Sequence, residues 1–447
     1  MPDIGNLKVQ VYSEDGFKPI EGATCRITGQ NGSTVKEQVR SDDSGVCDVV
    51  EVDTPPIEYS MEPTGKIPYG LCDVFVDADG YEGIEIKGCQ VFPNREAIQI
   101  FPLKKIGRNG KREKKVEVIE VKENRLVGNF PPKIPEDPVK DLEKLKQTTG
   151  LVVLDKVVVP ELIVVHDGAP KKAAKNYTVR FKEYIKNVAS SEIYATWPIA
   201  TIKANILCII SFTLNRIYTE WYRGKGYNFQ ITSSTAYDHA FSYRRNIYDN
   251  ISKAVDEIFT TYVKLIGRKQ PLLTQYCDGI KVQCPGWMTQ WGSKSLGDAG
   301  KNEYQIIRDF YGTEIQFPRA DEVEGIPKSY PGYKLTIGSR GAPVRTVQTY
   351  LNRISVNYPA IPKVKVDSIY GKQTAESVKK FQSIFNLTPT GVVDYATWYQ
   401  ISNIYVAVSK IAELRNEYTG NKIFIPPNSN DSYRSDDVPK IEYPCDY

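Results

Sequence analysis

The chain has little of what a metalloprotein or a membrane protein needs. Its 447 residues include only two histidines, and its eight cysteines are scattered rather than arranged in Cys-x-x-Cys pairs. We therefore expect no metal site and no cofactor. No stretch approaches the roughly 20 apolar residues of a membrane-spanning helix. The first residues also lack the basic and then apolar pattern of a secretory signal.

A strong excess of one charge is also missing. The formal net charge is +4, which is too small to favour nucleic acid as the partner. A charged fraction of 25% and a hydrophobic fraction of 41% are typical of a globular chain. The length predicts about three domains. Four of the five tryptophans lie between Trp197 and Trp291. Flat rings suit stacking on sugars, although aromatic residues are more often core.

Residues 1–104 have the pattern of an all-β module. Apolar and polar residues alternate over Leu7–Tyr12, Ala23–Thr28 and Cys47–Val52, and clusters of Gly and Asp separate these stretches. We predict a β-sandwich, and the pattern resembles transthyretin-like and carboxypeptidase-regulatory-like sandwiches. No catalytic group stands out. Four cysteines fall on or beside the strands and are expected to be buried free thiols rather than disulfides: Cys25, Cys47, Cys72 and Cys89.

Residues 105–150 differ in composition. A basic run, Lys104–Lys115, is followed by the proline-rich Pro131–Pro138 and then by a charged stretch. Such a segment buries little apolar surface, so we predict an exposed linker that proteases can reach. A plain interdomain linker is the simplest interpretation. The sharper hypothesis is an activating cut near Gly150 that frees the N-terminal module.

Residues 151–320 mix strand-like and helical stretches, which predicts an α+β domain. Glu192 stands in a small, polar run before Trp197-Pro198, and apolar residues at helical spacing follow from Ile199 to Ile217. We predict a loop-borne acid at the mouth of a core helix. Partial burial favours the protonated form of a carboxyl group, which suits a proton donor. On local evidence alone, a plain negative charge near a helix start explains Glu192 more simply.

Three motifs in this region occur in the order found in one family. The pattern from Glu192 through Trp197-Pro198 to Lys203-Ala-Asn resembles the Glu…Trp-Pro…Leu-Lys-Ala-Gln signature of SpoIID-type lytic transglycosylases. Ile231–Phe241 and Met288–Gly292 resemble the Asp-Gln-Val-Tyr and Met-Ser-Gln-Tyr-Gly segments of that family. The resemblance implies that Glu192 is the catalytic acid. The candidates for the substrate cleft are Lys203, Tyr237, Asp238, His239, Gln290 and Trp291.

Some of these candidates have simpler explanations, and some positions depart from the family pattern. Lys203 is as well explained by a solvated lysine, and His239 better by a satisfied polar neighbour than by a base. Ile210 stands where the family usually has Arg, and Cys284-Pro285 replaces His-Gly. The zinc-binding His and Cys of some members have no counterpart. Cys284 is close enough in sequence to Cys277 for the two to pair.

Residues 334–420 carry the clearest motif. Leu335–Leu351, Val366–Gly371, Thr374–Gln382 and Leu387–Trp398 follow the pattern of the three-helix peptidoglycan-binding module, and they resemble it strongly. The resemblance implies a small helical domain that binds the cell wall; a similar bundle with another partner is the alternative. Residues 321–333 are expected to be a linker. Residues 421–447 are expected to be a loose tail.

The order of these modules resembles the SleC family of spore cortex-lytic enzymes over essentially the whole chain. The resemblance implies a zymogen that a subtilisin-like Csp protease activates at germination. Its partner would be cortex peptidoglycan containing muramic lactam. Its reaction would cleave the β-1,4 MurNAc–GlcNAc strand, with Glu192 acting first as acid and then as base to give a 1,6-anhydro product. Lacking a secretory signal, such a protein would be made in the mother cell and reside in the cortex and coat region of the spore.

Two other functions remain open from the sequence. A hydrolytic muramidase or glucosaminidase would pair Glu192 with a second carboxylate, for which Asp238 and Asp278 are the candidates. A wall-bound scaffold without activity would be compatible with the replaced residues.

Overall fold

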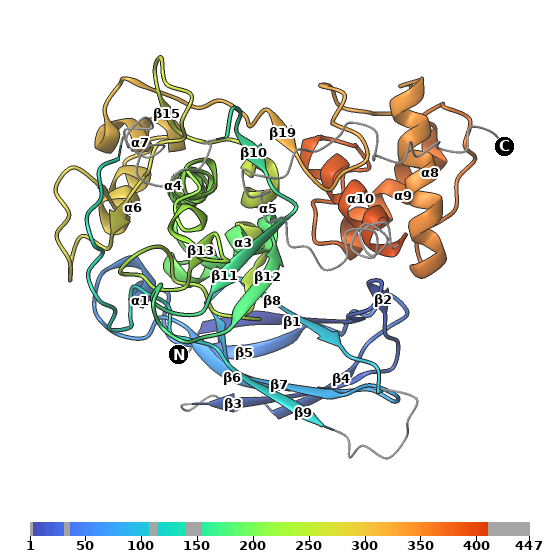
Figure 1. Cartoon of the computed structure of the whole chain (residues 1–447). Helices are drawn as coiled ribbons and strands as arrows, with labels where there is room; N and C mark the ends of the chain where they lie inside the picture. The colour runs from blue at the N-terminus through green and yellow to red at the C-terminus, as the bar shows by residue number, and fades with distance from the viewer. Residues whose placement is uncertain (1–2, 31–35, 107–114, 139–153, 410–447) are drawn as a thin grey trace. The chain divides into compact units, whose positions relative to one another are not determined.

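The strands of the N-terminal region belong to two sheets (Figure 1). The structure, a computed structural model, describes residues 3–30, 36–106, 115–138 and 154–409. One sheet has the order β14-β8-β1-β2, in which β14 (Ile247–Tyr248) comes from the central part of the chain and β5 is also paired to β1. The other sheet has the order β4-β3-β6-β7-β9. The N-terminal strands are β1 (Asp3–Ser13), β2 (Lys18–Pro19), β3 (Thr24–Gln30), β4 (Lys36–Arg40), β5 (Val50–Thr54), β6 (Gly70–Asp77), β7 (Gly83–Val91), β8 (Glu96–Leu103) and β9 (Val116–Glu120).

The core of this region comes from one face of each sheet. Along β1, Leu7, Val9 and Val11 are buried while their neighbours are more exposed, as a period of two requires. The sheets contact each other through β5 with β6, β7 with β8, and β1 with β7. The predicted β-rich N-terminus is therefore confirmed. Its four cysteines are buried free thiols, as expected: Cys25, Cys47, Cys72 and Cys89.

Backbone and side-chain hydrogen bonds join these sheets to the central part of the chain. The two residues of β14 (Ile247–Tyr248) pair antiparallel with Ile98 and Ala97 of β8. The short helix α1 (Glu58–Met61) contributes the carbonyl of Ser60, which accepts a hydrogen bond from the Trp197 indole at 2.9 Å. Trp197 is thereby fixed in the core.

The predicted linker is not uniformly exposed. β9 pairs in parallel with β7, and the chain then runs without helix or strand to residue 138. In this stretch Asn124, Arg125, Leu126 and Lys133 are buried. The expectation of an exposed segment is wrong for these residues, because their side chains find partners in the central region. The basic run 107–114, the predicted cleavage region near Gly150 and the tail lie outside the described residues.

The central region is built around one buried helix, α4 (Ile199–Tyr218), which the apolar spacing predicted. Pro198 is its N-cap residue. The other helices are α3 (Phe181–Glu192), α5 (Asp249–Ile258), α6 (Gln290–Asp298) and α7 (Glu303–Tyr311), and η1 (Arg223–Lys225) is a short 3-10 turn. The strands are β10 (Val158–Val159), β11 (Leu162–His166), β12 (Asn176–Arg180), β13 (Ile231–Thr232), β15 (Lys264–Leu265), β16 (Tyr276–Cys277), β17 (Met288–Thr289), β18 (Ile315–Gln316) and β19 (Glu322–Val323).

Three helices form the described part of the C-terminal region, up to residue 409, as the motif predicted: α8 (Ala342–Asn357), α9 (Lys372–Ile384) and α10 (Tyr395–Val408). Two buried glutamines hold the intervening loops. Gln348 of α8 bonds to Asp367 and to the carbonyl of Ile369, and Gln382 of α9 bonds to the carbonyl of Val392. Within the described residues, no helix has the length and apolar content to cross a membrane.

Candidate active site

Glu192 is the last residue of α3, not a loop residue as the sequence suggested, and its side chain is fully buried. Oε1 accepts a hydrogen bond from the backbone N–H of Ala240 at 2.5 Å, and Oε2 accepts one from the hydroxyl of Tyr276. The carbonyl of Glu192 accepts a bond from Gln290 Nε2 at 3.0 Å. Three separate segments thus converge on this residue and fix its carboxyl group in one orientation.

A buried ion cluster anchors α3 to α5. Asp256 Oδ1 accepts a hydrogen bond from Lys182 Nζ at 2.8 Å, and Oδ2 accepts one from Lys186 Nζ at 3.0 Å. Burial alone would raise the pKa of Asp256, but the two ammonium groups outweigh it and lower the pKa below its usual value. This cluster holds the helix that ends at Glu192.

His239 lies beside this site but is not arranged as a base. Its Nδ1 is 2.9 Å from the hydroxyl of Tyr184, and its ring stacks on Tyr276 with centroids 5.9 Å apart. Burial, assisted by the nearby charge of Lys133, holds the pKa of His239 well below its usual range. Burial, with the charge of Glu192, raises the pKa of Tyr276 well above 10, so this hydroxyl remains a donor.

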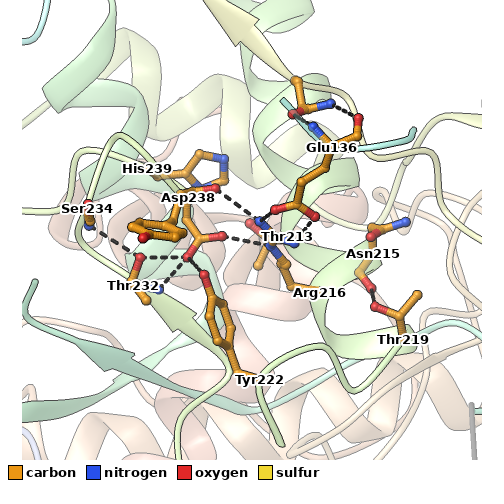
Figure 2. A network of polar contacts seen from close by, with 12 residues as sticks. Glu136, Thr213, Asn215, Arg216, Thr219, Tyr222, Thr232, Ser234, Asp238 and His239 are labelled. Atoms are coloured by element: carbon orange, nitrogen blue, oxygen red, sulfur yellow. Dashed lines mark hydrogen bonds and ion pairs between the residues drawn. The ribbon is translucent and has the colours of Figure 1, made fainter. Parts of the chain in front are cut away.

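Asp238 occupies the centre of a saturated polar network (Figure 2). Oδ2 accepts hydrogen bonds from Tyr222 Oη at 2.6 Å and from the backbone N and Oγ1 of Thr232 at 2.9 and 2.6 Å. Oδ1 accepts a bond from Arg216 Nε at 2.7 Å. With four donors on two oxygens, both carboxylate oxygens of Asp238 are engaged within this network.

The other carboxylate considered from the sequence is also engaged locally. The two oxygens of Asp278 accept hydrogen bonds from the backbone N–H groups of Lys281 and Val282 at 2.6 and 3.0 Å. This turn lies within the loop that the disulfide Cys277–Cys284 closes. The pairing of these two cysteines, suggested by their spacing, is present.

The remaining predicted cleft residues divide into two groups. Lys203 pairs with Glu257 of α5 at 2.7 Å. Tyr237 contributes its carbonyl to Arg216 Nη2 at 3.0 Å. By contrast, Gln290 contacts Glu192 directly, as described above, and Trp291 beside it is partly exposed. The Trp291 ring packs on Trp197 with centroids 5.0 Å apart.

Residues 121–138, which we call the strap, lie over this site. The backbone N–H of Arg125 donates to the carbonyl of Ser191 at 2.8 Å, and Asn124 Nδ2 donates to the carbonyl of Ile193 at 3.1 Å. Nη1 of Arg125 lies 4.0 Å from Oε1 of Glu192. The strap therefore binds the backbone on both sides of the acid as well as approaching its carboxylate.

Further along the strap, Lys133 reaches the neighbouring network. Its Nζ donates to the carbonyl of Asp238 at 2.7 Å and lies 4.6 and 4.8 Å from the ring centroids of Phe212 and Tyr276. Burial, followed by the charge of Arg125, lowers the pKa of Lys133 to about 7. Its ammonium is therefore near its titration point at neutral pH.

Glu136 makes the strongest polar contact of the strap. Its two carboxylate oxygens accept hydrogen bonds from Nη1 and Nη2 of Arg216 at 2.9 and 2.7 Å (Figure 2). Its backbone N–H donates to Gln275 Oε1 at 3.0 Å, and its carbonyl accepts from Gln275 Nε2 at 2.6 Å. Two-pronged pairing of this kind is among the strongest ionic contacts in proteins.

Sequence reasoning did not identify Tyr276, Arg216 or the strap residues Arg125, Lys133 and Glu136. One signal was available for Arg216, because a charge inside an otherwise apolar helix requires a buried partner. No comparable signal marks the strap. Among the described residues, no three His, Cys, Asp or Glu side chains gather in a way that would hold a metal ion.

Two family models match parts of the chain. Residues 170–262, which include Glu192, Arg216 and Asp238, match the model described as "Stage II sporulation protein" (SpoIID). Residues 340–401, which span α8 and α9 and enter α10, match the model described as "Putative peptidoglycan binding domain". Together they support a cell-wall lytic protein of sporulation that acts on peptidoglycan.

Comparisons with whole proteins support no further conclusion about the fold or the function of this chain. The search of curated proteins found no significant match. Among solved structures, the Bacillus anthracis TIE protein is 17% identical, with 23% of this chain and 17% of that one covered, at a TM-score of 0.16. A mutant catechol 1,2-dioxygenase of Acinetobacter radioresistens is 14% identical, with 26% and 58% covered, at 0.18. The chain thus spans less than two thirds of either protein.

Proposed function

We propose that this protein is a spore cortex-lytic enzyme similar to the SleC family, and that it cleaves peptidoglycan strands as a lytic transglycosylase. The observation that carries the proposal is the difference between its carboxylates. Glu192, which lies within the matched SpoIID region, is held by Ala240 and Tyr276. Asp238 and Asp278 are committed to structural hydrogen bonds. Of these three carboxylates, that of Glu192 is the one paired with a residue of the strap, and a single acid is what a transglycosylase needs.

The proposed reaction uses Glu192 twice. Its carboxylic acid first gives a proton to the oxygen that links MurNAc to GlcNAc, and the bond from this oxygen to the anomeric carbon breaks. The resulting carboxylate then removes the proton from the C6 hydroxyl of the same MurNAc. That oxygen attacks the anomeric carbon and closes a 1,6-anhydro ring. The acid is regenerated, and no water enters the reaction.

The protein as described is in an inactive arrangement under this proposal. A general acid must touch the oxygen that it protonates, whereas the Glu192 carboxyl group is fully buried beneath the strap. We propose that proteolysis beyond residue 138, near Gly150, lets the strap leave. A subtilisin-like Csp protease active at germination is the proposed activator. The C-terminal module would keep the activated enzyme on muramic-lactam-containing cortex.

The product identifies the reaction. Decoated spores or purified cortex are treated with intact protein, with protein cut in the region 139–153, and with cut Glu192→Gln. The proposal predicts 1,6-anhydro-muramic ends, detected by mass spectrometry, from the cut protein alone. Loss of the acid should reduce the rate by roughly 10² to 10⁴-fold.

Any other outcome would indicate a different function or contradict part of the proposal. Reducing ends in the products would indicate hydrolysis instead of transglycosylation. Absence of cleavage by well-folded cut protein would leave a wall-binding scaffold. Equal activity of cut and intact protein would contradict the zymogen part of the proposal.

A further inference from the structure

The contact between Glu136 and Arg216 points to a ligand site beneath the strap. Arg216 is 1% exposed, and its Nε is taken by Asp238, whereas both of its terminal nitrogens face the Glu136 carboxylate. Glu136 is 16% exposed at its side chain, so this end of the guanidinium lies close to the surface. When the strap leaves, two directed donors of Arg216 remain without that carboxylate.

The charges at this point favour an anion once Glu136 has gone. Asp238 balances the positive charge of Arg216, and Lys225 adds a second cation close by. The Arg216 guanidinium lies 5.2 Å from the ring centroid of Trp221, and the ammonium of Lys225 lies over the same ring at 3.2 Å. Without Glu136, these three charged groups carry a net charge of about +1 next to a flat aromatic face.

The carboxylate position is also close to the proposed acid. Arg216 is held by Asp238, and Glu192 accepts its hydrogen bond from Ala240, two residues further along the chain. Asp238 and Ala240 belong to one short segment, so the same stretch of chain positions Arg216 and Glu192. Lys133 of the strap is subject to the charges of both Glu192 and Arg216, which places the two groups around one strap residue.

We propose that Arg216 forms a carboxylate subsite of the peptidoglycan groove, which a stem-peptide carboxylate occupies after Glu136 leaves with the strap. The inference rests on the proposed function, since it takes peptidoglycan as the substrate. Glu136 is then an internal mimic of that carboxylate. Arg216 is a substrate-binding residue, and its fork of N–H donors matches a carboxylate better than a neutral amide.

The first experiment tests the subsite in the full chain. Glu136→Ala removes the internal carboxylate, and Glu123→Ala removes an exposed carboxylate from the same strap as the control. We expect acetate to raise the melting temperature of Glu136→Ala in a concentration-dependent way, and acetamide to have little effect. Neither probe should shift Glu123→Ala. Equal shifts with acetate and acetamide would overturn the proposal.

The second experiment tests the substrate class by titration calorimetry. Glu136→Ala, cut in the region 139–153, is titrated with N-acetyl-L-Ala-D-Glu whose carboxylates are free or amidated. The free peptide should bind at least about tenfold more tightly, because a hydrogen bond to a charged partner exceeds a neutral one by this order. Equal affinity for the two forms would contradict a carboxylate subsite.

Comparison of free with amidated stem peptides also separates this inference from the proposed function. With cut parent protein, glycan carrying amidated stem peptides should show a KM raised by about tenfold or more with kcat little changed. If neither glycan is cleaved while the free dipeptide still binds selectively, the proposed function fails and the subsite stands. If both glycans are cleaved with the same KM, the subsite fails and the function stands.

Discussion

Nη1 of Arg125 lies 4.0 Å from Oε1 of Glu192, and the two side chains are only 5% and 0% exposed. The two residues come from segments with different roles, since Arg125 is part of the strap and Glu192 ends the helix α3. Removing one partner of a buried ion pair while the other stays buried costs about 3–5 kcal/mol, because the remaining charge has no compensation. The strap and the proposed acid are therefore coupled: anything that exposes Glu192 must also move Arg125 into water.

Tyr276→Phe tests how the acid is held. The substitution removes the hydroxyl that donates to Glu192 Oε2 and keeps the ring that stacks on His239. A hydrogen bond to a charged group contributes about 1.5–3 kcal/mol, so the free energy of unfolding should fall by this amount. Denaturant titration measures it, and the partly exposed Tyr304→Phe is the control. Equal stability of the two variants would mean that the Tyr276 hydroxyl does not support Glu192.

Asp238→Asn distinguishes a structural carboxylate from a catalytic one. The amide loses the charge that faces Arg216 and presents an NH₂ group to donors from Thr232 or Tyr222. We expect a loss of about 3–5 kcal/mol in the free energy of unfolding. Asp278→Asn, which weakens one local turn, should cost about 1 kcal/mol. An Asp238→Asn protein of parental stability that lacks activity after cleavage would instead assign Asp238 a role in the reaction.

The helix α4 and the position of Glu192 show what periodicity predicts and what it does not. The isoleucines from Ile199 to Ile217 recur at helical spacing, and the helix was correctly predicted. The end of α3 was not correctly predicted, because Ala189-Ser190-Ser191 contains two serines, which are weak helix formers in isolation. In the structure these residues are buried, and packing maintains the helix as far as Glu192.

The strap was misjudged for a different reason. Its prolines and charges have the composition of an exposed linker, and composition reports only how little apolar surface a segment offers. Burial here is achieved by matching individual partners, such as Glu136 with Arg216 and Arg125 with Glu192. Those partners are distant in sequence, so no local pattern records them. The family motif singled out Glu192 as the proposed acid, whereas the strap that covers Glu192 is visible only in three dimensions.

Reduction of the disulfide should loosen the loop that follows Tyr276. Cys277–Cys284 closes a short loop beside this residue, and a cross-link of that size stabilises by about 2–3 kcal/mol in the loop-entropy model. Dithiothreitol should therefore lower the melting temperature of the parent. The double variant Cys277→Ser/Cys284→Ser should melt at that lower temperature with or without the reductant. A reductant effect of the same size on the double variant would place the redox sensitivity at another pair of cysteines.

Docking of the strap should depend on pH through Lys133. The pKa of Lys133 is about 7 when docked and near its ordinary value of 10.5 when released into water. Between these values the released strap binds more protons, so docking becomes more favourable as pH rises from 7 and is weakest below pH 7. Burial is the main cause of the lowered pKa of Lys133. The nearby cations Arg125 and Arg216 act in the same direction, and Glu192 and Asp238 act against it.

Hydrogen exchange of the strap amides, expressed as protection factors at pH 7 and pH 9, measures this dependence. Protection should increase with pH in the parent. It should be higher and nearly independent of pH in Lys133→Met, which places an apolar chain between the Phe212 and Tyr276 rings in place of an ammonium group. The control is Lys122→Met, because Lys122 lies on the same strap, is half exposed and pairs with Asp167. If the protection factors of Lys133→Met increased with pH as much as those of the parent, a group other than Lys133 would govern docking of the strap.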